Sequence, residues 1–143
     1  MILPDKHIRR ALTTALNNIE INETIIPLYD SRTNNENPNY YILMSTQTNS
    51  QVDGSKCGRE WQSSIVLDVV TRFEGSGNVG SRLFADDIAG EVIQRLDNFQ
   101  LLGSSGLSIY KQNINLPNDL NLVTPSETIY RKIIRLEVSI KEL

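Results

Sequence analysis

The chain has 143 residues, of which 39% are hydrophobic and 22% are charged, and these values are typical of one soluble globular domain. The length is too small for a nucleotide-binding domain followed by a separate substrate domain, so we expect a single domain over residues 1–143. The net charge of -3 argues against a general nucleic-acid binder, whose affinity depends on many Lys and Arg contacts to phosphates.

The first predicted element is an amphipathic helix. Apolar residues recur at helical spacing from Ile8 to Ile19, and Pro4 and Asp5 stand before them as start signals. Residues 24–29 follow with β-branched side chains and an internal proline. This composition is typical of an edge strand or of another extended segment.

Two strands with a long connection are predicted next. The polar residues 31–39 indicate a loop, and residues 40–46 have the aromatic and branched side chains of a strand. The polar run 47–58 predicts an unstructured connection, which is long for a compact domain. Residues 59–73 then alternate between apolar and polar side chains, as a strand with one solvent-exposed face does, although Val66 and Val70 partly cover that face.

The C-terminal half predicts one helix and two strands. Apolar residues between positions 79 and 96 recur at helical spacing and give a second amphipathic helix. Residues 106–114 predict a further strand, residues 115–127 a loop with Pro and Asn, and residues 128–140 a last alternating strand.

The segment 75–80 reads G-S-G-N-V-G and matches the G-x-G-x-x-G pattern of dinucleotide-binding folds. In those folds the preceding strand is covered on both faces and nearly continuously hydrophobic, whereas Asp68 and Arg72 interrupt it here. No acidic residue that could hold a ribose follows the next apolar run, and more than half of the chain precedes the motif. We therefore interpret residues 74–78 as a turn from strand to helix, with Asn78 or a neighbour as the helix cap.

Other catalytic patterns are incomplete. His7 is the only histidine, so it lacks partners for a His-based metal site, and a Ser-His-Asp triad would have to recruit it from the first turn of a helix. Asp86 and Asp87 point to different helix faces, which favours exposure over a paired general acid and base. Cys57 is the only cysteine and is interpreted as a reduced thiol in a loop. We expect no enzyme activity, no cofactor and no metal.

Targeting signals are also missing from the pattern. The first six residues lack the basic region and the long apolar run of a signal peptide. No stretch approaches the roughly 18 apolar residues of a membrane span. We expect a protein that is made and kept in a cytosol and that has no membrane partner.

Five stretches together carry a distinctive order of elements. They are I-I-P-L-Y-D at 25–30, P-N-Y-Y-I-L-M at 38–44, E-W-Q-S-S-I-V-L-D-V-V-T-R-F at 60–73, R-L-F-A-D-D-I-A-G-E-V-I-Q-R-L at 82–96 and I-I-R-L-E-V-S-I at 133–140. This order resembles the tail-completion or tail-terminator family of long-tailed bacteriophages, over nearly the whole chain. The resemblance implies an α+β domain with a largely antiparallel, twisted sheet of about four to five strands, backed by two amphipathic helices.

The same resemblance implies a mechanical function in the virion. Family members assemble into rings, commonly hexamers, that cap the tail tube and join it to the head, with the tail-tube protein and the head-tail connector protein as partners. DNA passes through the lumen of such a ring without specific recognition, and assembly takes place in the host cytoplasm. The long polar link 47–58 departs from the family and leaves open whether this chain caps a long tail or forms another neck ring.

A ring subunit needs exposed loops and strand edges with which to contact its neighbours. The polar segments 47–58 and 115–127 are the candidate contact loops, with solvent-exposed connections as the alternative interpretation. The candidate contact residues are Gln47, Asn49, Gln51, Asp53, Lys56, Asn115, Asn118, Asp119 and Asn121.

Two other functions stay open. A small non-catalytic α+β adaptor domain that binds another protein would have the same pattern of helices and strands. A nucleotide-dependent enzyme would use Gly75, Gly77 and Gly80, and it would melt at a higher temperature with millimolar dinucleotide.

Overall fold

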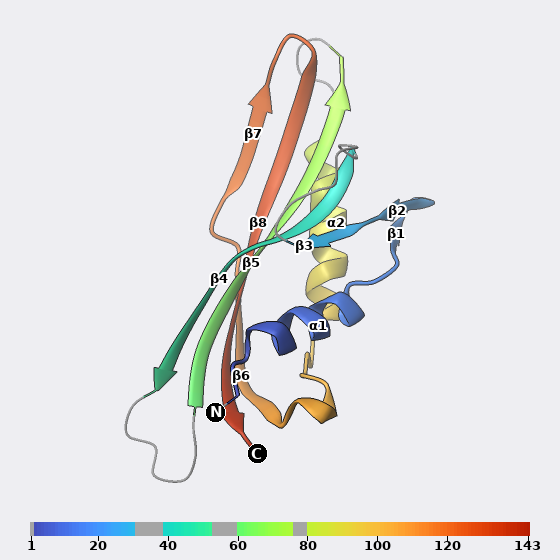
Figure 1. The fold of residues 1–143 in the computed structure, drawn as a ribbon. Helices are drawn as coiled ribbons and strands as arrows, with labels where there is room; N and C mark the ends of the chain where they lie inside the picture. Colours follow the sequence, from blue (N-terminus) through green and yellow to red (C-terminus); the bar gives the residue numbers. More distant parts are fainter. Residues whose placement is uncertain (1, 31–38, 53–59, 76–79) are drawn as a thin grey trace.

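The computed structural model of the chain describes residues 2–30, 39–52, 60–75 and 80–143. Two α-helices, eight strands and one short 3-10 helix occur in these ranges (Figure 1). In chain order they are α1 (Asp5–Ala15), β1 (Ile19–Ile21), β2 (Thr24–Ile26), β3 (Leu28–Asp30), β4 (Tyr40–Val52), β5 (Glu60–Glu74), α2 (Arg82–Arg95), η1 (Gly103–Ser105), β6 (Leu107–Asn115), β7 (Asp119–Val123) and β8 (Glu127–Glu142).

Six of the strands form one sheet in the order β3-β4-β5-β8-β6, with β7 also paired to β8. The pair β3–β4 is parallel and every other pair is antiparallel, while β1 and β2 form a separate antiparallel hairpin. The strands β6 and β7 pair in succession with the same side of β8, at residues 135–142 and 128–132. The predicted α+β class is confirmed, and the main sheet has six strands because two short segments beside prolines also join it.

Both helices contribute to a single core on one face of this sheet. The alternation of β5 places Ile65, Leu67 and Val69 in that core, where all three are at most 1% exposed. The helices contribute residues at three- and four-residue spacing, namely Ile8, Ala11 and Leu12 from α1 and Ile88, Ala89 and Val92 from α2. Each large apolar side chain buried here contributes roughly 1.5–3 kcal/mol, so this face provides most of the stability.

The end of α1 is fixed by the side chain of Arg95 on α2. Its guanidinium donates hydrogen bonds to the backbone oxygens of Asn17 at 2.5 Å and Asn18 at 3.3 Å, and its Nε donates to Glu91 at 2.9 Å. Carbonyl groups at a helix C-terminus are unpaired within the helix and carry partial negative charge, so a cation at this position is favourable. Asn18 has a positive φ of 56°, which lets the chain leave the helix and enter β1.

Two of the loop predictions are wrong. The segment 47–58 begins inside β4, since its residues 47–52 pair with residues 60–65 of β5, and only its later part lies outside the described residues. The segment 115–127 contains the whole of β7. Residues 47–52 and 119–123 are polar on at least one face. Their strand conformation is fixed by pairing with β5 and β8 rather than by local composition.

Candidate interaction surfaces

The predicted contact residues Gln47 and Asn49 connect β4 with α1. Arg9 donates from Nε to Gln47 Oε1 at 2.7 Å, and Gln47 donates to the backbone oxygen of Asp5 at 3.4 Å. Asn49 donates to the carboxylate of Asp5 and accepts from the hydroxyl of Ser63. These polar groups hold the first helix on the sheet where the apolar core ends, so any contact with a neighbour by these two residues stays a prediction.

The other predicted contact residues of the first segment lie farther along the chain. Gln51 pairs with Trp61 near the end of β4 and is exposed. Asp53 and Lys56 lie outside the described residues, as does Cys57.

The predicted contact residues of the second segment lie along the edge of β8. Asn115 ends β6 and donates from its side chain to Glu137 at 3.2 Å, and the backbone oxygen of Asn118 accepts from the amide of Ile133 at 3.1 Å. Asp119 and Asn121 belong to β7, whose five residues are all exposed. This segment is therefore an exposed strand, and a contact function for it stays a prediction.

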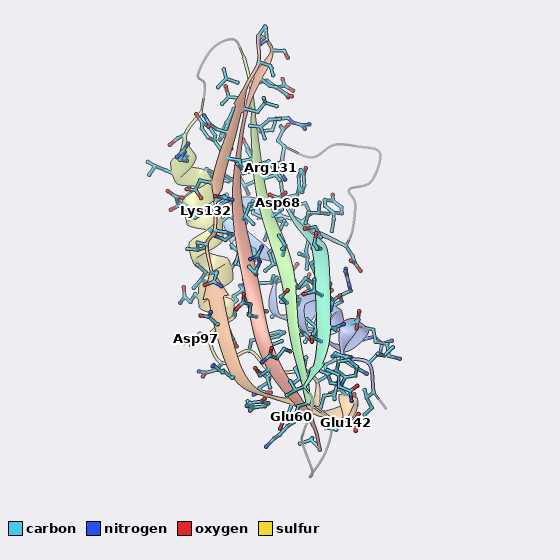
Figure 2. The ribbon with its side chains drawn as sticks, turned by 90° about the vertical axis from the view of Figure 1, so that its left-hand side faces the viewer. Glu60, Asp68, Asp97, Arg131, Lys132 and Glu142 are labelled. Atoms are coloured by element: carbon cyan, nitrogen blue, oxygen red, sulfur yellow. The ribbon has the colours of Figure 1, made fainter. Side chains whose placement is uncertain are left out.

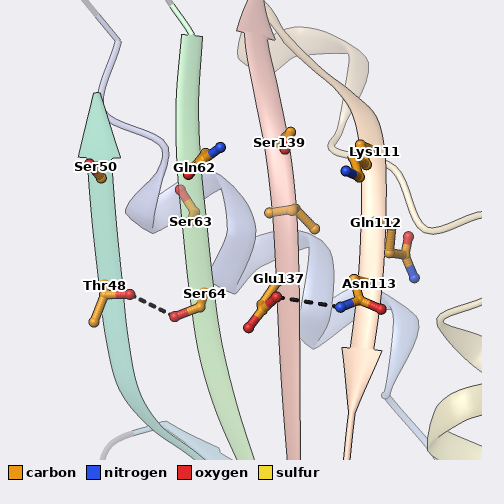
Figure 3. Close-up of a pocket in the computed structure, with 11 residues that line it drawn as sticks. Thr48, Ser50, Gln62, Ser63, Ser64, Lys111, Gln112, Asn113, Glu137 and Ser139 are labelled. Carbon is orange, nitrogen blue, oxygen red and sulfur yellow. Dashed lines mark hydrogen bonds between the residues drawn. The ribbon is translucent and has the colours of Figure 1, made fainter. Parts of the chain in front are cut away.

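The sheet face opposite the helices is polar at the end that includes the C-terminus. Side chains from four strands, β4, β5, β8 and β6, line a shallow depression of about 700 Å³ there (Figure 3). Within it the hydroxyls of Thr48 and Ser64 are 2.6 Å apart, and Asn113 donates to Glu137 at 3.5 Å. The lining consists of hydroxyl and amide groups with one Lys and one Glu, which can donate and accept hydrogen bonds.

The other end of the same face is more apolar and includes the ion pair of a buried carboxylate, Asp68, with Arg131. Asp68 is 5% exposed, and Arg131 on β8 donates to its carboxylate from Nε at 3.2 Å and also from Nη2 (Figure 2). The hydrogen bond with Asp68 is the main cause of the raised pKa of Arg131, which keeps the guanidinium charged. The surrounding side chains are mostly apolar, namely Tyr41, Leu43, Val70, Leu120, Leu122 and Ile129, and include the polar Arg72 and Asn121.

This apolar region departs from the predicted alternation of β5. The pattern assigns Asp68 to the solvent-exposed face, whereas neighbouring side chains bury it. Val70 on the same face is 4% exposed, in agreement with the expectation that it covers the surface. The Asp68–Arg131 pair joins residues 63 apart in the sequence, so local alternation could not identify it.

A second ionic cluster links β7 to the helix layer. Lys132 of β8 donates from Nζ to Asp86 of α2 at 3.0 Å and to Asp119 of β7 at 3.3 Å. The pKa of Lys132 is raised, and the largest cause is the hydrogen bond with Asp86. Burial opposes this shift, and the hydrogen bond with Asp119 adds to it. Asp86 is therefore an ion-pair partner of Lys132.

Gly80, the last glycine of the G-x-G-x-x-G motif, packs against the aromatic ring of Phe73. Gly80 has a positive φ of 76°, and a Cβ at this position would overlap the ring of Phe73. The helix cap is Ser81, whose Oγ accepts from the amide of Leu83 at 3.0 Å. The sequence predicts Asn78 or a neighbour as the cap, and Asn78 lies outside the described residues, as does Gly77. At Gly80 the motif thus provides close packing between strand and helix.

Metal ligands and membrane-spanning helices can be assessed for the residues that the structure describes. Among them there is no group of three or more His, Cys, Asp and Glu side chains that could hold a metal ion. None of their helices is long and apolar enough to cross a membrane. His7 is partly buried on α1, and this burial, followed by the charges of Lys6 and Arg10, lowers its pKa.

Comparison with known proteins identifies the fold. No protein-family model matches the chain, and no curated protein matches it. Among solved structures, the chain is similar to one from the virion of a native gene transfer agent (GTA) particle, with a TM-score of 0.68 and 14% sequence identity. The match covers 94% of this chain and 96% of the other, so the two share one α+β fold from end to end.

Proposed function

We propose that this protein is a structural component of a phage-like virion, and that copies of it form a ring at the neck or tail. The ring would cap the tail tube and join it to the head. The observation that carries this proposal is the fold likeness to a chain of the GTA virion, which extends over nearly the whole of both chains.

The surfaces of the subunit support an assembly function. A monomeric protein rarely leaves apolar side chains exposed on an edge strand, because such a strand pairs with other chains. Here β7 exposes Leu120 by 44%, Leu122 by 56% and Val123 by 43%. The ion pairs of Asp68 with Arg131 and of Lys132 with two acids stabilise the sheet on which these residues lie.

The proposed partners are those of a neck ring: further copies of this chain, the tail-tube protein and the head-tail connector protein. A hexamer would place six subunits around a lumen through which DNA passes without sequence-specific contacts. The depression around Thr48, Ser64 and Asn113 has one Lys and one Glu among its hydroxyl and amide groups. Such a surface is suited to weak contact with DNA, since phosphate binding depends on many cations.

The mass of the purified full-length protein tests this proposal. Native mass spectrometry should detect a closed oligomer, and six copies of a 16.1 kDa subunit give about 97 kDa. Electron microscopy of the protein mixed with the tail-tube protein of the same particle should show rings at tube ends. A protein that stays monomeric at high micromolar concentration and ignores tubes would contradict the proposal, and recovery of a cellular, non-virion partner in a pull-down would favour an adaptor domain instead.

A further inference from the structure

The main sheet ends in two short strands that lie at the same level. One row of paired residues crosses the sheet from β3 to β7, through Leu28, Ile42, Val69, Lys132 and Asp119. Among the strands that the structure describes, β3 ends the sheet on one side of this row and β7 ends it on the other (Figure 1). A copy placed beside the first could thus bring its β7 against β3, and a shift of about two residues along the strands sets Asn121 opposite Leu28 and Leu120 opposite Tyr29.

The backbone of β7 has hydrogen-bonding groups directed away from the subunit. Hydrogen bonds with β8 occur just before and just after this strand, at the Asn118 oxygen (3.1 Å) and at the Thr124 amide (2.8 Å). In an antiparallel pair the bonded residues alternate, so Leu120 and Leu122 also bond to β8. The N–H and C=O groups of the residues between them, including Asn121, therefore point to the open edge.

The strand β3 offers the matching edge. The amide of Ile42 donates to the oxygen of Pro27 at 2.9 Å, and the alternation along a parallel pair then directs the backbone of Leu28 away from β4. The strand directions also match. Because β3 runs parallel to β4 and each later pair is antiparallel, β3 and β7 run in opposite directions within one subunit. Two copies side by side in the same orientation would present an antiparallel pair.

The side chains at these edges are complementary on the face opposite the helices. Tyr29 on β3 and Tyr41 on β4 form an edge-to-face aromatic pair with ring centroids 6.0 Å apart. At the other edge Leu120 and Leu122 lie on this same face and are 44% and 56% exposed. Aromatic and aliphatic side chains on adjacent strands form favourable cross-strand pairs.

We infer that the sheet continues from subunit to subunit, with β7 of one copy paired antiparallel to β3 of the next. This inference rests on the proposed function and specifies its subunit contact. The occupant of the β7 edge is a second copy of this chain because the chain itself carries an edge of matching level, direction and side-chain chemistry. Such a contact joins two different surfaces, and repeated contacts of this kind close into a ring when the rotation between copies allows it.

Asn121→Pro is the variant that tests the pairing. Proline removes an N–H that points to the open edge, and proline is tolerated on edge strands, so the subunit fold should survive. We expect at least a tenfold higher protein concentration for half-assembly in native mass spectrometry, with the circular dichroism spectrum unchanged. Asn121→Ala keeps the N–H and is the matched control, which should assemble like the unmodified protein.

A crosslinking experiment keeps the inference testable if the proline variant does not fold. In a Cys57→Ser background, Tyr29→Cys combined with Leu120→Cys, the residue opposite it in this register, should give disulfide-linked chains under oxidation. Tyr29→Cys combined with Leu83→Cys is the control, because Leu83 lies on α2 and is 69% exposed. Rings that form without this crosslink, or that tolerate Asn121→Pro, would overturn the edge pairing and leave the proposed function standing. A wild-type chain that forms no ring and ignores tubes would instead overturn the proposed function.

Discussion

Replacing Gly80 by alanine should destabilise the protein by about 2–5 kcal/mol. Two costs add at this position. An L-residue at a φ of 76° costs roughly 1–2 kcal/mol relative to glycine. The new Cβ would also overlap the ring of Phe73, and overpacking of this kind costs typically about 1–3 kcal/mol because the ring or the backbone must move.

Gly90→Ala provides a control of the opposite sign. Gly90 is an exposed residue within α2, and a Cβ there meets no atom within 4 Å. Alanine in a helix interior is more favourable than glycine by about 0.5–1 kcal/mol, so this variant should be more stable than the unmodified protein. The pair of variants separates a requirement for glycine at position 80 from a general effect of the added methyl group.

Urea unfolding followed by circular dichroism measures the change in unfolding free energy for Gly80→Ala and Gly90→Ala, and thermal unfolding measures the change in Tm. An unfolding entropy of about 2.1 cal/mol/K per residue means that 1 kcal/mol corresponds to a shift of about 3 °C in Tm for a chain of 143 residues. Gly80→Ala should therefore melt roughly 7–17 °C lower. If Gly80→Ala lies within about 0.5 kcal/mol of the unmodified protein, the packing explanation of the third glycine is refuted.

Three other predictions concern the helix cap, the polar network and the ionic cluster. Ser81→Ala should cost about 0.5–2 kcal/mol in urea unfolding through loss of the cap. Asn49→Ala should cost about 1–3 kcal/mol because it removes two side-chain hydrogen bonds, whereas Ser50→Ala on the exposed face should change stability by less than about 0.5 kcal/mol. The pKa of Lys132 is raised in the folded state, chiefly by its bond with Asp86, so its contribution to stability is full below its unfolded pKa and is lost as pH rises through the folded value. Urea midpoints measured between about pH 9 and 12 should thus fall more steeply for the unmodified protein than for Lys132→Met, and parallel curves would contradict the assignment.

The elements that the sequence predicts well are those whose apolar period is long and unbroken. The alternation of residues 59–73 identifies β5 to within one residue at each end, and the helical spacing behind Pro4 identifies α1. Each of these elements buries one face. Apolar residues must then recur with the period of the element, which is about 3.6 residues in a helix and about 2 in a strand. The start of α2 is harder to place from the sequence: the pattern predicts a cap at Asn78 or a neighbour, and the structure has it at Ser81.

The strands that the sequence misses are held by partners far along the chain. Residues 47–52 are polar, yet they form a strand because β5 pairs with them and because Asp5 and Ser63 satisfy the side chain of Asn49. The segment D-L-N-L-V at 119–123 does alternate, which is a signal for β7. Five residues between Pro117 and Pro125 are nevertheless too few for that alternation to outweigh the loop composition around them.

The third glycine of the motif is linked to β7, the strand of the proposed subunit contact, through an aromatic side chain. Phe73 packs against Tyr40 and Tyr130 with ring centroids 5.8 Å and 6.0 Å apart, and Tyr130 pairs with Asn121 of β7. The ring that Gly80 contacts therefore supports the part of β8 on which β7 lies. Gly80→Ala should loosen this support and lower stability in the monomer, whereas Asn121→Pro should leave monomer stability unchanged and weaken only the contact between copies. If Asn121→Pro lowered both the stability of the monomer and the assembly of copies, β7 would be needed for the fold itself rather than for pairing.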